Sequence, residues 1–145
     1  MEDLLIKKTN REMVINKQKK LKQIKDEFQE QFPFLKLEFY SGFHKQGEGS
    51  EKKTMLADGL TIGEVCKLTT EEIISISESM KVSELEKAFK DIFGLSVQVF
   101  RKSNNLWLQT TITDGWSLEK QNQNAKEMNV QENLNTEPND YHEEE

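Results

Sequence analysis

The residue types that most often carry catalysis or bind metals are scarce in this chain. It has two histidines, His44 and His142, and a single cysteine, Cys66. A metal site needs several His, Cys or carboxylate ligands at suitable spacing, and a cysteine nucleophile needs an adjacent base. These three residues form no such motif. We therefore predict no metal site, and we interpret Cys66 as a small buried apolar residue.

Two other patterns match chemical motifs only in part. Residues 42–47, "GFHKQG", have the glycine spacing of a P-loop, but Glu48-Gly49 follows where that motif requires Lys-Ser or Lys-Thr. Adjacent acids such as Glu71-Glu72 lie on a predicted solvated surface, whereas catalysis by paired carboxylates needs a cleft that tunes the two groups differently. The sequence thus predicts no catalytic residue, no cofactor and no enzyme activity.

Basic residues cluster near the N-terminus. Between Lys7 and Lys25 there are eight basic residues and one acidic residue, Glu12. Lysines along a helix can contact backbone phosphates, and an aromatic side chain such as Phe39 could stack on a base. The candidate nucleic-acid contacts are Lys17, Lys20, Lys22 and Lys25. The chain as a whole is acidic and has no known nucleic-acid-reading motif, so we interpret the run first as a solvated helix face.

Large aromatic residues in the second half are the candidates for contact with a protein partner. Trp107 and Trp116 would belong to the core if both point inward. If either is exposed together with Phe100 or Leu106, it would form a contact patch, because aromatic anchors dominate the energetics of interfaces. Apolar residues from Leu4 to Ile15 exceed those in the matching part of the second half, and they could pair with a second copy in a homodimer.

The composition fits one domain with tails. The chain has 145 residues, 34% hydrophobic and 32% charged, with a formal net charge of -6; this length is typical of a single domain. No run of about 18 apolar residues occurs. The first residues, "MEDLLIKK", lack the positive leader and long apolar run of a signal peptide. Together with the single cysteine, these features favour a cytoplasmic protein.

The C-terminal residues are acidic and poor in apolar side chains. From Glu119 to Glu145 there are two lysines and eight acidic residues. Such a segment cannot bury enough surface to offset its conformational entropy. We predict a disordered acidic tail over residues 123–145, with order lost from about residue 128. The tail would either solubilise the protein or dock loosely on its basic N-terminal segment.

In the first half, apolar spacing predicts a helix over residues 12–31. Leu21, Ile24 and Phe28 recur at intervals of three and four, and Pro33 ends the pattern. The alternation after Pro33 predicts a strand over residues 35–40. The further predicted elements are a short strand at 54–56, a turn at 58–59, a short helix at 62–68 capped by Thr61, and a strand at 72–77.

In the second half, Ser83 followed by Glu86 has the spacing of a capping box. It predicts a helix that ends at Gly94, which suits a left-handed C-terminal residue. The elements predicted after this helix are a strand at 95–100, a turn at 103–105, a strand at 106–111, a turn at 114–115 and a short helix from residue 116.

The two halves repeat one order of elements. Three residues of the first helix match three of the second at an offset of 61, namely Ile24, Phe28 and Phe32 with Leu85, Phe89 and Phe93. We predict an α+β fold with an internal duplication of helix–strand–strand–short helix units, residues 12–68 and 80–122, and an extra strand at 72–77 between them. The units would share a small mixed or antiparallel sheet covered by helices on one face.

A resemblance to known proteins covers the second half. "ESMKVSELEKAFKDIFGL" followed by "TDGWSLEKQN" resembles the ubiquitin-like β-grasp pattern over residues 72–122. There is no C-terminal Gly-Gly, so the resemblance does not imply a conjugated modifier. The stretch "FGLSVQVFRKSNNLWLQTTITDGWSLEKQN" is also similar to a family of small uncharacterised bacterial proteins, and this resemblance implies no activity.

These observations give one prediction of organisation and two of function. We predict an N-terminal segment (1–11), a single α+β domain (12–122) and the acidic tail (123–145). The favoured function is a non-enzymatic protein-interaction or adaptor module, with Trp107, Trp116 and Phe100 as contacts. The alternative is a weak, sequence-independent nucleic-acid binder that uses the basic N-terminal helix.

Overall fold

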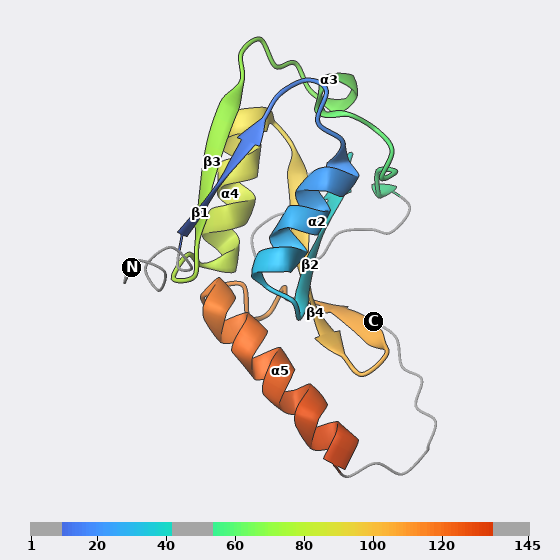
Figure 1. The fold of residues 1–145 in the computed structure, drawn as a ribbon, viewed down its shortest axis with the longest axis vertical. Coiled ribbons are helices and arrows are strands. Elements are labelled where there is room, and N and C mark those ends of the chain that lie inside the picture. The colour runs from blue at the N-terminus through green and yellow to red at the C-terminus, as the bar shows by residue number, and fades with distance from the viewer. Residues whose placement is uncertain (1–9, 42–53, 135–145) are drawn as a thin grey trace, which may run out of the picture.

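The computed structural model describes residues 10–41 and 54–134 of the chain (Figure 1). In chain order its elements are β1 (Asn10–Ile15), α2 (Leu21–Gln31), β2 (Leu35–Tyr40), α3 (Ile62–Val65), β3 (Glu72–Ser77), α4 (Val82–Phe93), β4 (Ser96–Ser103), β5 (Leu106–Gln109) and α5 (Leu118–Leu134). Helices combined with antiparallel strands confirm the predicted α+β class.

The strands divide between two sheets, where the sequence predicted one shared sheet. β1 pairs with β3 in one sheet, and the other has the order β2-β4-β5. All of these pairings are antiparallel. The strand at 72–77, predicted as an extra element, is therefore the partner of β1.

The predicted helix over residues 12–31 is wrong at its start, because the helix begins only at Leu21. Residues 10–15 form β1 instead, in which buried Met13 and Ile15 alternate with exposed Glu12 and Val14. This period of two is that of a half-buried strand. Because this strand pattern lies directly before the helical spacing of α2, residues 12–31 were predicted as one helix.

Helix α4 begins two residues earlier than a cap at Ser83 would allow. Ser83 lies inside the helix, and the N-cap is Lys81, whose backbone N–H donates to Glu84 Oε1 over 2.9 Å. Val82 is fully buried at the first helical position, so packing sets this boundary. The predicted left-handed end is confirmed, because Gly94 has φ 66°.

The same backbone hydrogen bonds occur in both halves. At the start of α2, Leu21 N–H donates to the Leu60 carbonyl over 2.9 Å; at the start of α4, Val82 N–H donates to Trp116 over 3.0 Å. The reciprocal bonds run from Ile62 to Lys19 (2.9 Å) and from Leu118 to Met80 (2.8 Å). The backbone hydrogen bonds thus repeat at positions where the sequence repeats. That both halves come from one duplicated unit stays a prediction.

If the chain is divided after residue 69, the first half contains β1 and β2 and the second half β3, β4 and β5, so each half supplies strands to both sheets. Met13 of β1 lies opposite Ile74 of β3, and Leu37 of β2 lies opposite Val99 of β4. All four residues belong to one hydrophobic core. The core also joins the helices to the sheet, for example through Phe39 of β2 and Phe89 of α4, whose ring centroids are 5.7 Å apart.

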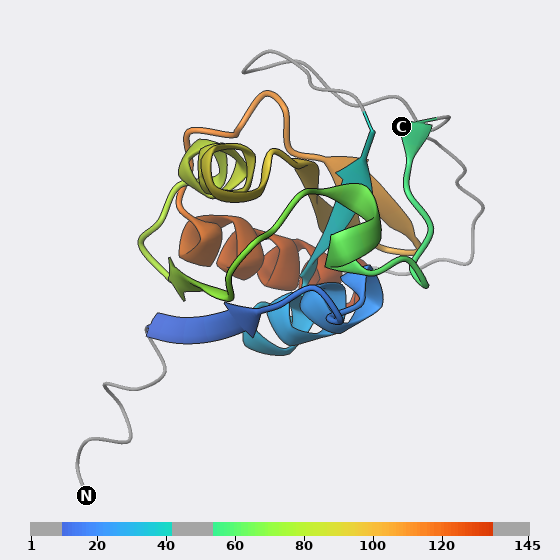
Figure 2. The same ribbon diagram turned by 90° about the horizontal axis from the view of Figure 1, so that it is seen from above.

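The predicted disorder over residues 123–145 is wrong for its first part, because α5 extends to Leu134. Ala125 is fully buried, and α4 and α5 both lie on one side of the three-stranded sheet (Figure 2). Two asparagines anchor the helix: Asn122 Oδ1 accepts from Phe34 N–H (2.8 Å), and Asn129 Nδ2 donates to the Lys102 carbonyl (3.0 Å). Polar anchors of this kind leave no apolar stripe in the sequence. Residues 135–145 lie outside the described residues.

We expect that neither half folds alone, because each lacks the partner strands for both sheets. Cutting between the exposed residues Thr69 and Thr70 should give fragments 1–69 and 70–145 with unfolded spectra, whereas the mixture should regain the spectrum of the intact chain. Amide dispersion in ¹H–¹⁵N NMR spectra would show both results.

The matched control is the full chain with a protease site inserted at the same point and cleaved after folding. A fragment that gives a dispersed spectrum by itself would contradict the interlocked arrangement.

Candidate interaction surface

The three-stranded sheet has one face in the core and one directed away from it. Residues of β2 and β4 that point into the core are Leu35, Leu37, Phe39, Val97 and Val99. The alternate residues form the outer face, which includes Lys36, Glu38, Tyr40, Gln98, Phe100 and Lys102. Tyr40 and Phe100 are buried but do not belong to the hydrophobic core.

At the β4–β5 end of the outer face, two lysines lie over Trp107. Register places Lys102 opposite Trp107 and Lys36 opposite Phe100. Lys36 Nζ lies 5.0 Å from the Trp107 ring centroid and 5.4 Å from that of Phe100, and Lys102 Nζ lies 5.8 Å from Trp107. Both distances to Trp107 are within the range of cation–π attraction. We call these four residues the Trp107 surface.

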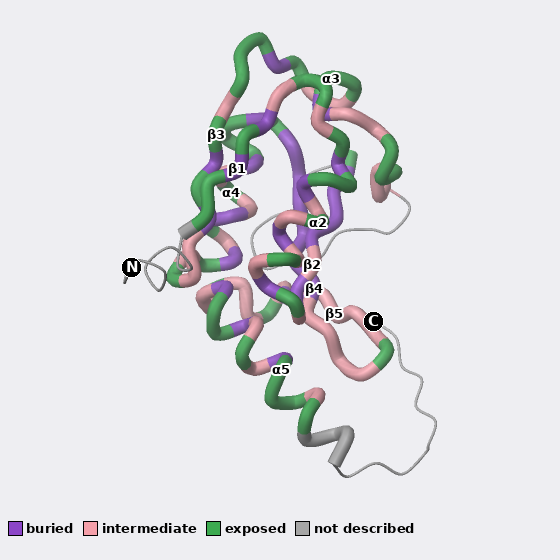
Figure 3. Tube along the Cα trace, viewed as in Figure 1, coloured by how far each residue is buried: buried purple, intermediate pink, exposed green. Residues whose placement is uncertain are grey.

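Most of the Trp107 surface is half-buried, as is the rest of the β4–β5 hairpin tip except for exposed Asn105 at its turn (Figure 3). Phe100 is only 7% exposed, so it offers little area to a partner. Of the three aromatic contacts predicted from the sequence, the structure thus brings Phe100 and Trp107 together.

Trp116 lies elsewhere, in the loop between β5 and α5. Its carbonyl accepts from Val82 N–H at the start of α4, and its half-buried ring lies 4.3 Å from Lys120 Nζ. Trp116 therefore has the same kind of lysine contact as Trp107 at a separate position. Neither tryptophan belongs to the hydrophobic core.

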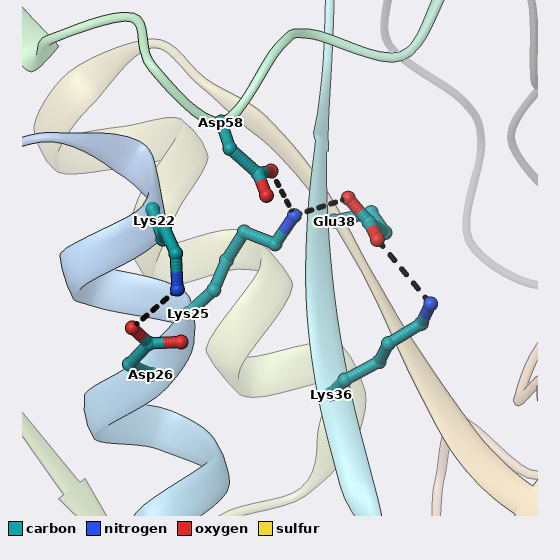
Figure 4. A network of polar contacts seen from close by, with 6 residues as sticks. All are labelled: Lys22, Lys25, Asp26, Lys36, Glu38 and Asp58. Carbon is teal, nitrogen blue, oxygen red and sulfur yellow. Dashed lines mark hydrogen bonds and ion pairs between the residues drawn. The ribbon is translucent and has the colours of Figure 1, made fainter.

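Beside the Trp107 surface, an ion-pair network joins α2 to the outer face of β2 (Figure 4). Lys25 Nζ donates to Glu38 Oε1 over 2.7 Å and also bonds to Asp58. Lys36 Nζ lies 3.4 Å from the other Glu38 oxygen, Oε2. Burial alone would lower the pKa of Lys25, but its bonds to Asp58 and Glu38 outweigh that effect, so the pKa is raised above its usual value.

The candidate nucleic-acid contacts do not form one basic helix face. Lys17 and Lys20 lie before the first residue of α2 and are exposed. Lys22 pairs with Asp26 at 3.0 Å, and Lys25 is paired with two carboxylates. These ion pairs reduce the positive charge available to phosphates.

Tyr40 carries an unusual polar group on the outer face. Its hydroxyl is buried and has no hydrogen-bond partner among the described residues. Burial, and then the Glu38 carboxylate, raise the pKa of Tyr40 above its ordinary value. The neutral phenol is therefore strongly favoured in the folded protein.

The residue types that suggest metal or nucleophilic chemistry do not converge. Within residues 10–41 and 54–134, no group of three or more His, Cys, Asp and Glu could hold a metal ion. Burial raises the pKa of the Cys66 thiol, which disfavours the reactive thiolate. His44, His142 and the glycine-bearing residues 42–47 lie outside the described residues. In the same described part, no helix is both long and apolar enough to span a membrane.

Sequence reasoning missed Lys36 and Lys102 as members of this surface. The signal for Lys102 was local, since a turn centred on Asn104-Asn105 places residue 102 opposite residue 107. Lys36 alternates with core residues in β2, but its neighbours Phe100 and Trp107 come from the other half of the chain. Only the non-local pairing of β2 with β4 reveals that contact.

In comparisons with known proteins, no family model, no curated protein and no solved structure matches the chain. The resemblances to β-grasp proteins and to small bacterial proteins therefore stay predictions.

We expect Lys25→Ala to destabilise the fold by about 3 kcal/mol, because Glu38 would remain buried without its nearest cation. Lys22→Ala is the matched control on the same helix: its pair with Asp26 is exposed on both sides (61% and 63%), so removing it should cost less than about 1 kcal/mol. Urea denaturation of both variants gives the two free energies of unfolding. Equal costs would show that the network does not stabilise the fold.

Tyr40 should stay protonated where an ordinary tyrosine ionises. Folding raises the pKa of Tyr40. Protonated Tyr40 therefore favours the native state fully below the unfolded pKa of about 10, and this contribution to stability is lost as the pH rises beyond that value. Tyrosinate absorbance at about pH 10–11 should therefore be the same for the wild type and Tyr40→Phe while the protein stays folded. A smaller signal in the variant would mean that Tyr40 ionises normally.

Proposed function

We propose that the protein is a non-enzymatic interaction module that binds a partner protein through the Trp107 surface. The observation that carries the proposal is a half-exposed tryptophan with two lysines over its ring, on a sheet face outside the core. Tryptophan combines a large apolar area with few rotatable bonds, which makes it a frequent anchor at interfaces.

A comparison of the two halves supports this assignment. Tyr40 of β2 pairs with Met55, and the corresponding pair in the second half is Lys102 with Trp107. The core positions keep similar apolar types in both halves, as Phe28 and Phe89 illustrate. The core positions are thus repeated in both halves. Of the two matched pairs, only Lys102 with Trp107, at the β4–β5 end, is part of a cation–aromatic cluster.

Nucleic-acid binding remains the second candidate, because exposed Lys17 and Lys20 accompany a tryptophan flanked by lysines. Two observations count against it. The formal net charge is -6, and Lys22 and Lys25 are paired with carboxylates. A mobility-shift titration at low salt tests it: a shift that weakens steeply with salt, and that Lys17→Glu with Lys20→Glu removes, would favour this function.

The predicted homodimer has one structural basis. Val14 and Ile73 face each other across β1 and β3 and are 44% and 56% exposed. Sedimentation velocity over a range of concentrations tests it: a monomer at every concentration would exclude the homodimer.

We expect Trp107→Ala to abolish capture of the partner, because truncation removes the central anchor; losses at such positions are typically 2 kcal/mol or more, roughly a thirtyfold drop in affinity. Trp116→Ala is the matched control, since it removes a tryptophan with an equivalent lysine contact at another site. Affinity capture from cells that produce the protein, read by quantitative mass spectrometry, should show proteins held by the wild type and Trp116→Ala but lost by Trp107→Ala.

Thermal unfolding of each variant controls for a loss of fold. Lys102→Glu, which leaves the tryptophan in place, provides a second test that does not remove apolar packing. If Trp107→Ala retains every protein that the wild type captures, the Trp107 surface is not the binding site.

A further inference from the structure

We propose that helix α5 positions the Trp107 surface, and that Asn129 is the positioning residue through which it does so. This inference rests on the proposed function and adds how the binding surface is held and where it can be regulated. Two independent observations carry it: a series of hydrogen bonds that joins α5 to Lys102, and the sparse packing of the second half of α5.

Two asparagines of α5 bracket the backbone that carries Lys102. Asn122 Oδ1 accepts from Phe34 N–H over 2.8 Å. The Phe34 carbonyl accepts from Lys102 N–H over 2.9 Å. The Lys102 carbonyl accepts from Asn129 Nδ2 over 3.0 Å, so the series of bonds begins and ends on α5. Asn122 and Asn129 are two helical turns apart and therefore lie on the same face of the helix. We call these two residues the asparagine clamp.

The clamp holds the part of the β4–β5 hairpin that builds the Trp107 surface. Both backbone groups of Lys102 form hydrogen bonds outside the hairpin, with Phe34 and with Asn129. Asn129 also binds the turn, because its Oδ1 accepts from Asn104 N–H over 2.8 Å. Asn104 has φ 58°, in the left-handed region that asparagine tolerates better than most residues. Asn129 thus holds both the strand that carries Lys102 and the turn that leads to Trp107.

The second half of α5 has little other contact with the domain. Among the described side chains of the helix, the buried ones are Leu118, Gln121 and Ala125, which all lie in its first half. After Ala125, residues 126–128 and 130 are exposed, and Asn129 is half-buried. A segment that buries so little apolar area opens locally at a low cost in free energy. Its docking therefore depends on Asn129, on which the Trp107 surface depends as well.

This shared residue couples the docking of α5 to the binding surface. While the second half of α5 is docked, Asn129 holds the backbone of Lys102, whose Nζ lies 5.8 Å from the Trp107 ring centroid. When that half opens, the bonds of Asn129 to the hairpin are lost. Coupling between two sites is reciprocal, so a partner bound at Trp107 would stabilise docked α5, and release of α5 would weaken partner binding.

The first test measures the positive charge at the Trp107 ring. In a Trp116→Phe background Trp107 is the sole tryptophan of the chain, and its fluorescence is quenched by added iodide or caesium ions at constant ionic strength. Lysines over the ring attract iodide and repel caesium, so the ratio of the two quenching constants reports where those lysines lie. We expect Asn129→Ala to lower this ratio by about twofold, the scale of losing one nearby charge in screened water.

Two further variants calibrate this measurement. Lys102→Met keeps the length of the side chain without its charge, so it gives the ratio expected when the contact of Lys102 with Trp107 is lost. Asn124→Ala is the matched control, because Asn124 is also half-buried on α5 but makes none of the bonds of the clamp. It should leave the ratio at the wild-type value.

The second test separates positioning from overall stability, by amide hydrogen exchange of the full ¹⁵N-labelled protein. We expect Asn129→Ala to accelerate exchange at Lys102 and Asn104 by about tenfold, as the loss of one hydrogen bond typically gives. The amides of Leu37 and Val99, in the centre of the sheet, should keep their wild-type rates. A purely structural role of Asn129 would accelerate all four amides equally.

Aspartate distinguishes the two members of the clamp. Asn122 accepts a hydrogen bond from Phe34, and an aspartate keeps that acceptor, so Asn122→Asp should restore the Lys102 exchange rate that Asn122→Ala raises. Asn129 donates to Lys102 from Nδ2, and an aspartate has no such donor, so Asn129→Asp should leave the Lys102 rate raised. If Asn129→Ala lacks the dispersed spectrum of the wild type, Asn129→Asp replaces it in the exchange test.

Three outcomes would overturn the inference: an unchanged iodide-to-caesium ratio in Asn129→Ala, equal effects of Asn129→Ala and Asn124→Ala, or equal acceleration of all four amides. Neither test needs a partner, so their results are distinguishable from failure of the proposed function. If the ratio falls while partner capture does not depend on Trp107, the proposed function fails and the positioning role stands. If capture depends on Trp107 while the ratio is unchanged, the positioning role alone fails.

Discussion

The pairing of β2 with β4 is the constraint on which the rest of the structure depends. It joins β2 to β4, the central strand of the larger sheet, and pairs residues that are 56 to 66 positions apart in the chain. One face of this pair places Leu37 beside Val99 in the core, where α2 and α4 also pack. β1 of the first half likewise pairs with β3 of the second half. The core of each half therefore forms only with strands from the other half. Such non-local contacts form only after long loops have closed, so the fold must assemble as one unit.

The same pairing also builds the candidate surface. Lys36 comes from the first half and Trp107 from the second, and their 5.0 Å contact exists only because β2 lies beside the β4–β5 hairpin. Helix α5 is hydrogen-bonded to this hairpin. Asn129 Oδ1 accepts from Asn104 N–H at the turn, and Asn129 Nδ2 donates to the Lys102 carbonyl. The orientation of Trp107 therefore depends on three separate segments, which is typical of a surface fixed before a partner arrives.

How far the sequence could predict the structure depended on whether each signal was local. The spacing of Leu85, Phe89 and Phe93 and the glycine after them predicted α4 and its end, because a helix is specified by neighbouring residues. β1 was missed, since only two of its side chains are buried and a strong helical pattern follows. The start of α5 was predicted, as a short helix from residue 116, but its extent to Leu134 was missed because its anchors are asparagines. Residue type alone made Trp107 and Phe100 candidates for a surface, but Lys36 could not be predicted, because its contact with Trp107 joins the two halves.

The ion-pair network and the Trp107 surface are electrostatically linked through Glu38. This carboxylate is largely buried, so it needs a compensating cation. Lys25 supplies that cation at 2.7 Å, and Lys36 lies farther away, at 3.4 Å. If Lys25 were absent, Glu38 would have Lys36 as its only partner among these contacts and would compete with Trp107 for the ammonium group. Lys25 thus neutralises the acid on the outer face, and in doing so it leaves the charge of Lys36 available over the tryptophan. Lys25, one of the four lysines predicted to contact phosphates, thus acts through Glu38 on the charge of a surface that both halves build.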